Sequence, residues 1–256
     1  GVLNGGKRIR PFLVLETARM LGAGTDEALF AAAGLECLHC YSLVHDDLPA
    51  MDDDDMRRGK PTIHMAFDEA TAILAGDALL TLAFELTVSD HSGVKAETRC
   101  ALASALARDA GLAGMVGGQQ LDLENENQAV GEEMISRIHA MKTGALIRYA
   151  CTAGALIADS SDEDLAAMQR YGEVIGLAFQ MADDLLDVTA DSAKVGKATG
   201  KDSAAGKSTL VAIHGIDWAR KRLGTLVAEA DSILAPYGEN AEPLRATAHF
   251  IANRDF

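Results

Sequence analysis

The chain has 256 residues, of which 48% are apolar and only 5% aromatic, and its formal net charge at pH 7 is −15. A chain of this length and composition can bury a substantial core, which excludes a disordered protein. The excess of negative charge argues against nucleic acid as a partner, because a phosphate backbone requires a basic surface.

Helical periodicity runs through most of the chain, and only five prolines interrupt it. Clusters of strand-forming residues are scarce, so the sequence predicts no strand and an all-α fold. We expect Thr25 or Asp26 to cap the second helix. In chain order, the predicted helices cover residues 8–21, 26–48, 68–89, 95–111, 114–124, 131–158, 162–189, 207–235 and 240–253.

Two segments interrupt the helical pattern. Residues 49–62 begin at Pro49 and end in "RRGKPT". Residues 189–209, "TADSAKVGKATGKDSAAGKST", are rich in Gly, Ser, Ala and Lys, which predicts a mobile segment and a candidate lid. The "GKST" within it is not a P-loop, because Lys201 stands where the motif requires glycine.

Membrane and secretory features are weak. No apolar run reaches the roughly 18 to 20 uncharged residues of a membrane span, and the first residues do not form a secretory signal. Four cysteines without a disulfide framework suit a reducing compartment, so we expect a cytoplasmic protein. The pair Cys37 and Cys40 lacks the second ligand pair that zinc would need, which favours core residues over a metal or redox site.

Two acidic motifs carry the strongest chemical signal. "HDDLPAMDDDDMRRG", residues 45–59, has two aspartates at the end of a helical run and four more after a short interruption. In "FQMADDLLDV", Asp183 and Asp187 lie one helical turn apart on the same face. Carboxylates from two helices are the ligands that Mg²⁺ prefers when it is shared with a polyphosphate. The implied ligand is a diphosphate.

The bland alternative is a solvated acidic face, although both motifs are embedded in apolar helix sequence. An EF-hand fits poorly, because Arg58 would occupy the position of its turn glycine. Arginine forks and lysines suit phosphate oxygens, although any one of them could be an ordinary helix-end or surface charge. The candidates are Lys7, Arg8, Arg10, Arg57, Arg58, Lys142 with Thr143, Lys194, Lys197, Lys201 and Lys207.

The motifs "GGKRIRP", "LVHDDLPAMDDDDMRRGKPTIH", "GGQQLDLE", "MKTGALI", "FQMADDLLD" and "GKST", in this order, resemble the polyprenyl synthetase family over essentially the whole chain. The resemblance implies about ten mostly antiparallel helices around a central cavity, with the two acidic motifs facing each other. Residues 1–256 would form a single domain that lacks the N-terminal helix or two of the family.

The resemblance also implies the site residues. Three Mg²⁺ ions would be held by Asp46, Asp52 and Asp183, with Asp47 and Asp187 as close supports. Lys7, Arg10, His39 and Arg58 would bind the diphosphate of isopentenyl diphosphate. Arg57, Lys142 and Lys207 would bind the allylic diphosphate, and Thr143, Gln180 and Lys197 would line the allylic site.

The implied activity is a Mg²⁺-dependent condensation of isopentenyl diphosphate with dimethylallyl and geranyl diphosphate. Tyr41 and Ser42, one turn before the first motif, would form the floor of the cavity, and their sizes favour the fifteen-carbon product farnesyl diphosphate. Products of ten or twenty carbons, a non-catalytic partner that binds prenyl diphosphates and a terpene cyclase are the alternatives. A homodimer is expected from the resemblance.

Overall fold

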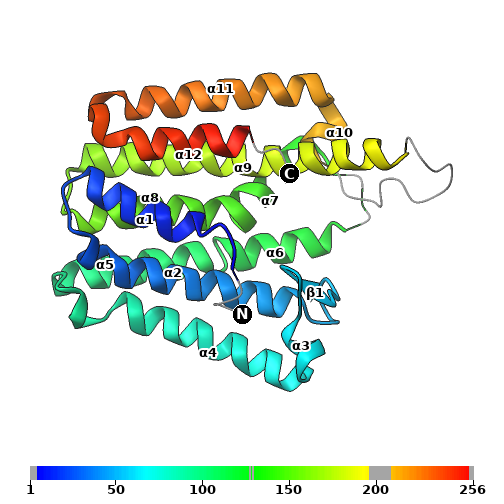
Figure 1. The fold of residues 1–256 in the computed structure, drawn as a ribbon, viewed down its shortest axis with the longest axis horizontal. Coiled ribbons are helices and arrows are strands. Elements are labelled where there is room, and N and C mark those ends of the chain that lie inside the picture. The colour runs from blue at the N-terminus through cyan, green and yellow to red at the C-terminus, as the bar shows by residue number, and fades with distance from the viewer. Residues whose placement is uncertain (1–4, 127, 129, 196–208, 254–256) are drawn as a thin grey trace. The chain divides into compact units, whose positions relative to one another are not determined.

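The computed structural model describes residues 5–126, 128, 130–195 and 209–253. These residues are mostly helical, so the prediction of an all-α fold is confirmed (Figure 1). Contacts within the chain define two compact units. Unit 1 comprises residues 1–106 and 153–160, and unit 2 comprises residues 107–152 and 161–256. A single domain around a central cavity stays a prediction.

Unit 1 is built around two long helices, α2 and α4. Helices α1 and α4 both pack against α2 (Figure 1). Apolar side chains of α1 and α2, among them Leu13, Val14, Leu35 and Leu38, are fully buried. The elements are α1 (Ile9–Met20), α2 (Thr25–Asp46), β1 (Met56–Arg57), β2 (Lys60–Pro61), α3 (Ile63–Ala66), α4 (Glu69–Thr87), the 3-10 turn η1 (Asp90–Ser92) and most of α5 (Ala96–Ala110).

Two glycines allow α2 and α4 to approach closely. A Cβ at Gly34 in α2 would lie 2.7 Å from the carbonyl oxygen of Ala83 in α4, and a Cβ at Gly76 in α4 would overlap the imidazole of His45 in α2. Larger side chains at either position would separate the helices. This contact fixes the carboxyl end of α2, where the first acidic motif begins.

Helix α4 carries three exposed apolar side chains, and the exposed Asp77, Thr81 and Glu85 lie on the same helix. Ile73, Leu74 and Leu82 are 45%, 66% and 38% exposed. By length and composition alone, α2 and α4 could each cross a membrane, but α2 is largely buried in the unit. A core helix passes the same test, so this is weak evidence for a span.

Unit 2 centres on the long helix α9, against which α11 and α12 pack (Figure 1). The buried Tyr171 of α9 donates a hydrogen bond to the carbonyl oxygen of Leu244 in α12 (2.7 Å). The elements are α6 (Met115–Glu124), α7 (Glu132–His139), the π-helical turn η2 (Ala140–Gly144), α8 (Ala145–Ile157), which ends in unit 1, α9 (Asp162–Val195), α10 (Leu210–His214), α11 (Ile216–Leu234), the 3-10 segment η3 (Ala235–Ala241) and α12 (Glu242–Ala252).

Several predicted boundaries were wrong. The predicted helix over 131–158 contains a π turn, and α9 continues to Val195, into the segment expected to be mobile. Gly215, with φ 87° and ψ 165°, divides the predicted helix over 207–235 into α10 and α11. Gly24, rather than Thr25 or Asp26, is the N-cap of α2, and its N–H donates to Glu27. A short hairpin, β1 and β2, forms where no strand was predicted.

Candidate functional site

The first acidic motif lies at the carboxyl end of α2. Asp46 is the last residue of the helix and the buried Asp47 is its C-cap. The backbone N–H of Asp52 donates to the carbonyl of Asp46 (2.9 Å), and that of Asp54 donates to the carbonyl of Asp47 (3.2 Å). These bonds satisfy carbonyl groups that a helix end leaves unpaired. They also bring Asp52 back beside Asp46, the residue with which it is predicted to share metal.

The donors at this helix end suit a divalent cation. The carboxyl end of a helix carries partial negative charge, so aspartates there are stabilised by a cation. Mg²⁺ commonly takes one or two carboxylates from the protein and its other oxygens from water and phosphate. Asp46 and the exposed Asp52 fit that requirement. Among the residues that the structure describes, no three His, Cys, Asp or Glu side chains form a ready-made metal cage.

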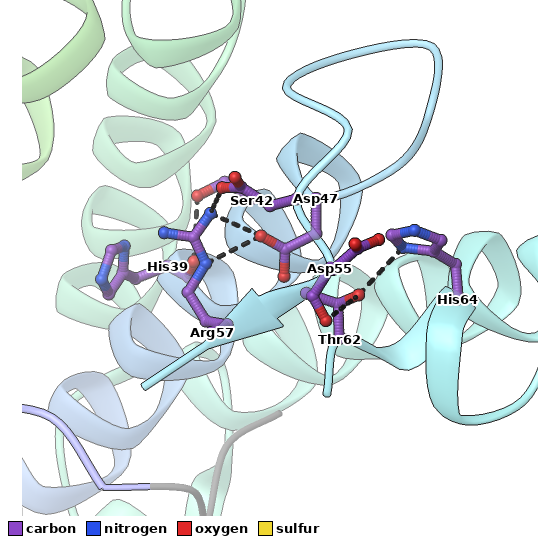
Figure 2. A network of polar contacts seen from close by, with 8 residues as sticks. His39, Ser42, Asp47, Asp55, Arg57, Thr62 and His64 are labelled. Carbon is purple, nitrogen blue, oxygen red and sulfur yellow. Dashed lines mark hydrogen bonds and ion pairs between the residues drawn. The ribbon is translucent and has the colours of Figure 1, made fainter. Parts of the chain in front are cut away.

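Arg57 ties the acidic motif to the hairpin that follows it (Figure 2). Its Nε donates to Asp47 Oδ1 (2.7 Å) and its Nη2 donates to Asp54 Oδ2 (2.8 Å). The hairpin turns at Arg58 and Gly59, which have φ values of 52° and 75°. The structure therefore places Arg57 on two carboxylates of the motif. Its predicted contact with the allylic diphosphate stays a prediction.

Thr62, which follows β2, bonds to the backbone just before β1. Its N–H and its Oγ1 both donate to the carbonyl of Asp55, at 3.0 and 3.3 Å. Its Oγ1 also lies 3.2 Å from Nδ1 of His64 (Figure 2). These bonds connect the two ends of the hairpin and fix the backbone at Asp55, the last aspartate of the motif.

Arginines gather around His39, two turns before the acidic motif on α2. Nη1 of Arg10 lies 3.5 Å from Nε2 of His39. Burial, followed by the charges of Arg10, Arg58, Arg8 and Arg57, lowers the pKa of His39 to about 2. The imidazole is therefore neutral near pH 7 and can serve as a hydrogen-bonding group beside four cations. Such a concentration of positive charge favours an anionic ligand.

Arg58 joins this cluster to the stretch "GGKRIRP". Its guanidinium donates to the carbonyl of Gly5 and packs against Gly6, where a Cβ would overlap it. Both glycines have positive φ values, 83° and 111°, so the conformation and the close approach each require glycine. Lys7 lies exposed in the same stretch. The structure thus brings together Arg10, His39 and Arg58, and connects Lys7 to them through the backbone.

A hollow adjoins these residues in unit 1. Its cavity volume is about 30 Å³, and it opens to solvent. Its polar lining comes from Asp47, Arg57, Arg58 and Thr62. The apolar lining comes from Cys40, Leu43, Val44, Pro61 and Ile63.

The two predicted floor residues lie on the same helix. Tyr41 is buried, and its ring meets the imidazole of His45 edge-on, with centroids 5.6 Å apart. Nε2 of His45 lies 3.0 Å from the carbonyl oxygen of Ile73 in α4. Ser42 donates to the carbonyl of His39 (2.9 Å). The Tyr41 ring therefore packs against His45, the residue through which α2 contacts Ile73 of α4. The role of Tyr41 in product length stays a prediction.

The second acidic motif lies on α9 in unit 2. Gln180 Nε2 donates to Oδ1 of the buried Asp184 (3.1 Å), and Thr143 Oγ1 donates to Oε1 of Gln180 (3.1 Å). Asp183 is partly exposed and precedes Asp184 on the helix. Two residues predicted to line the allylic site, Thr143 and Gln180, are thus in contact with each other and with the second motif.

The π turn η2 presents Lys142 in the same unit. Lys142 Nζ donates to Asp122 Oδ2 of α6 (2.6 Å). A Cβ at Gly118 of α6 would overlap the backbone nitrogen of Lys142, so only glycine permits this approach. π turns occur frequently at functional sites. At its start, His139 lies 3.9 Å from Asp184, and burial lowers the pKa of this histidine to about 4.

Some predicted residues lie outside what the structure describes. Lys197 and Lys207 fall in residues 196–208, and only the helical backbone of Asp187 is described. The two acidic motifs belong to different units, so their predicted placement opposite each other stays a prediction.

Three titratable residues near these side chains were missed by sequence reasoning: Glu36, which pairs with Arg8, Asp122 and His139. Glu36 and His139 are single polar residues within helices, and nothing in the local sequence distinguishes them. Asp122 had a signal, since it lies within the quoted motif "GGQQLDLE".

Comparisons with known proteins agree with this geometry. The sequence profile described as polyprenyl synthetase matches residues 1–233, and the chain belongs to this family. It is 49% identical to the farnesyl diphosphate synthase of Escherichia coli K12, covering 100% of this chain and 87% of that one. It is 42% identical to a geranylgeranyl diphosphate synthase of Cyanophora paradoxa, covering 98% and 84%.

A solved structure gives the same assignment of fold. The apo crystal structure of an FPP/GFPP synthase from Zymomonas mobilis matches with a TM-score of 0.87 and 40% identity, over 97% of this chain and 84% of that one. The isoprenoid synthase fold is therefore confirmed for this chain.

Proposed function

We propose that this protein is a Mg²⁺-dependent prenyltransferase that condenses isopentenyl diphosphate with dimethylallyl and geranyl diphosphate to give farnesyl diphosphate. One observation carries the proposal: arginines from the stretch before α1, from α1 and from the hairpin gather around His39 of α2, and two turns later α2 ends in the carboxylates Asp46 and Asp47. An anion site and a cation site thus lie along the same helix. Farnesyl diphosphate synthases among the relatives, at 41–49% identity, support the same activity.

The proposed substrate roles draw on residues of both units. In unit 1, Lys7, Arg10, His39 and Arg58 hold the diphosphate of isopentenyl diphosphate. The allylic diphosphate is held by Arg57, Lys142 and Lys207, with Thr143, Gln180 and Lys197 beside it. The Thr143–Gln180–Asp184 chain supports this assignment, because it fixes allylic-site side chains relative to the second motif.

Magnesium completes the site. Asp46 and Asp52 of the first motif and Asp183 of the second, supported by Asp47 and Asp187, would hold three Mg²⁺ ions. When bound, the ions supply positive charge that stabilises the departing diphosphate.

The reaction requires little further chemistry from the protein. The allylic carbon–oxygen bond breaks, and its electron pair leaves with the diphosphate, whose developing charge the arginines and lysines stabilise. The double bond of isopentenyl diphosphate then forms the new carbon–carbon bond. Loss of a proton to the released diphosphate restores an alkene. The chain positions both substrates and excludes water, which would otherwise trap the allylic cation.

The fifteen-carbon product rests on Tyr41 and Ser42. The buried Tyr41 ring, held edge-on by His45, supports its assignment as the floor of the hydrocarbon site. A twenty-carbon product is the second candidate, because relatives at 42–43% identity are geranylgeranyl diphosphate synthases.

The protein would act as a homodimer in the cytoplasm. The exposed apolar side chains of α4, above all Leu74 with 66% exposed, support a second copy as its partner. Four free cysteines, of which Cys37, Cys40 and Cys151 are buried, agree with a reducing compartment.

The test is incubation of the purified protein with Mg²⁺, isopentenyl diphosphate and dimethylallyl diphosphate, followed by analysis of product length. Farnesyl diphosphate that is absent with Asp46→Ala is the expected result. A product of ten or twenty carbons would keep the mechanism and overturn the assignment of the floor. Folded protein that forms no product would instead favour a non-catalytic prenyl-diphosphate-binding partner.

A further inference from the structure

Glu36 is a buried carboxylate that the reaction described above does not use. It lies on α2, one turn before His39, and is only 8% exposed. It forms an ion pair with Nη1 of Arg8, and the thiol of Cys40 lies 3.8 Å from the same oxygen. A carboxylate is costly to bury unless a cation compensates it, so the position of Arg8 and the burial of Glu36 depend on each other.

The partner of Glu36 occupies a strained backbone position. Arg8 has φ 52° and ψ 34°, the left-handed conformation, immediately before α1. An L-residue with a side chain adopts this conformation only where its surroundings hold it. Arg8 stands between Lys7 and Arg10, so the direction of its backbone determines where both of these side chains point. The ion pair is therefore placed to fix the entire basic stretch.

Two carboxylates of the α2 region each pair with a different arginine. Glu36 pairs with Arg8, and Asp47 pairs with Arg57, at opposite ends of the stretch of helix that faces the arginines. Between them, Arg10 meets the neutral His39. Each of the two carboxylates anchors one arginine, and the diphosphate assigned to this cluster falls between the two anchors.

We propose that Glu36 is a positioning residue, whose carboxylate fixes Arg8 and thereby orients Lys7 and Arg10 toward the diphosphate of isopentenyl diphosphate. This rests on the proposed function. Glu36 acts through Arg8 and does not contact the substrate. Its loss should weaken the binding of isopentenyl diphosphate while it leaves the allylic substrate and the chemical step unaffected.

The test is a double-mutant cycle of Glu36→Gln and Arg8→Gln in the complete protein, with Arg8→Lys as a third variant that retains the charge. The matched control is Glu16→Gln, which removes an ion pair with Arg19 that lies on the outer side of α1. Two quantities are measured: the KM of each substrate during turnover, and the Kd of isopentenyl diphosphate by calorimetry without allylic substrate. Thermal unfolding of each variant is followed in parallel.

Glu36→Gln and Arg8→Gln are each expected to raise the KM and Kd of isopentenyl diphosphate about tenfold. The KM of the allylic substrate and kcat should stay within about twofold of wild type, and the double variant should be no worse than the worse single variant. Arg8→Lys should recover part of the loss, and Glu16→Gln should resemble wild type.

Three results would overturn the proposal. Normal affinity in Glu36→Gln would remove its role, and a loss in Arg8→Gln alone would show that Arg8 contacts the diphosphate directly. A joint loss of both substrates with a lowered melting temperature would show a general structural role. If the wild type binds isopentenyl diphosphate but forms no product, the proposed function fails, while the Kd values still decide the role of Glu36. A wild type that does not bind it overturns both.

Discussion

His39 illustrates how a single residue can record the electrostatics of its surroundings. Its ordinary pKa of 6.5 falls to about 2 because the side chain is partly buried and Arg10, Arg58, Arg8 and Arg57 surround it. The histidine therefore contributes a hydrogen-bonding group whose charge does not vary across the physiological range. Substrate binding at this cluster should not depend on the protonation of His39 above about pH 4.

The free energy of unfolding, however, should depend on the protonation of His39. Below about pH 6.5 the unfolded chain takes up a proton on His39 that the folded protein does not, so the free energy of unfolding falls as the pH falls toward 2. Above about pH 7 this contribution is constant. Between pH 7 and pH 5 the wild type is expected to lose about 2 kcal/mol more than His39→Gln, as measured by urea unfolding. Equal losses would show that the folded protein protonates His39.

Two aspartates of the first loop offer a matched comparison. The backbone N–H of Asp52 donates to the carbonyl of Asp46, whereas that of Asp53 donates to the carbonyl of Leu48, and Asp53 has φ 53°. Asp52→Asn is expected to reduce condensation about 100-fold or more and to raise the Mg²⁺ concentration needed for half-maximal rate. Asp53→Asn removes the same charge, and asparagine tolerates its backbone, so activity should stay within about twofold. Equal effects would assign the loss to net charge and remove Asp52 from the metal site.

Candidate site residues could be found in the sequence where they stand in clusters. Two groups of aspartates and the arginines beside them have a spacing with a chemical meaning, so Asp46, Asp52, Arg10 and Arg58 could be identified. Glu36 could not, because it is a single glutamate in an apolar helix and only its pairing with Arg8, 28 residues away, gives it a role. Long-range pairing of this kind leaves no local signal.

At the scale of elements, glycines determine how closely the helices of the site approach one another. Gly118 lets α6 touch the backbone of the π turn at Lys142, whereas Gly224, inside α11, faces open space. Alanine is favoured over glycine within a helix by about 0.5–1 kcal/mol. If Gly→Ala lowers the free energy of unfolding instead of raising it by this amount, the difference measures how closely the backbones approach at that glycine.

Gly118→Ala is expected to destabilise the protein by about 1–3 kcal/mol, because the new Cβ forces α6 from the π turn. The KM of the allylic diphosphate should rise, since Lys142 would move with the turn. Gly224→Ala is the control, and it should raise the melting temperature or leave it unchanged. Both follow from thermal unfolding and steady-state kinetics. An unchanged KM of the allylic diphosphate in Gly118→Ala would show that the contact between α6 and the π turn does not affect the allylic site.

The helices themselves followed from periodicity, and the irregular elements did not. The boundaries of α1, α2, α4, α5, α6 and α12 lie within two residues of the prediction. The hairpin was missed because its turn is Arg58–Gly59, whereas the usual signal for two positive φ values is Asn-Gly or Asp-Gly. The π turn was missed because one additional residue in a helical turn alters no apolar pattern that a short window detects.

At the scale of the whole molecule, a net charge of −15 accompanies a proposed affinity for diphosphates. A negatively charged protein can bind diphosphates only where positive charge is concentrated. Here that charge comes from the arginines around His39 and from cations that the aspartates would bind. Binding of the allylic diphosphate should therefore require Mg²⁺, whereas isopentenyl diphosphate should still bind to the arginine cluster when Mg²⁺ is removed. Calorimetry of each substrate with and without EDTA tests this, and an equal loss for both would contradict it.

Assembly is the remaining property of the whole molecule, and the proposed homodimer would bury the exposed Leu74 on the side of α4 that faces away from α2. Leu74→Lys should place a charge within that interface and yield a monomer. Leu112→Lys is the control, because Leu112 is 87% exposed and lies in unit 2.

Light scattering coupled to gel filtration measures the outcome. The wild type and Leu112→Lys are expected at twice the mass of the chain, and Leu74→Lys at once the mass, with its helical circular dichroism retained. A wild type that is already monomeric would contradict the proposed dimer. A Leu74→Lys protein that remains dimeric would move the interface away from α4, because a lysine buried in an apolar contact without a carboxylate partner causes a large loss of affinity.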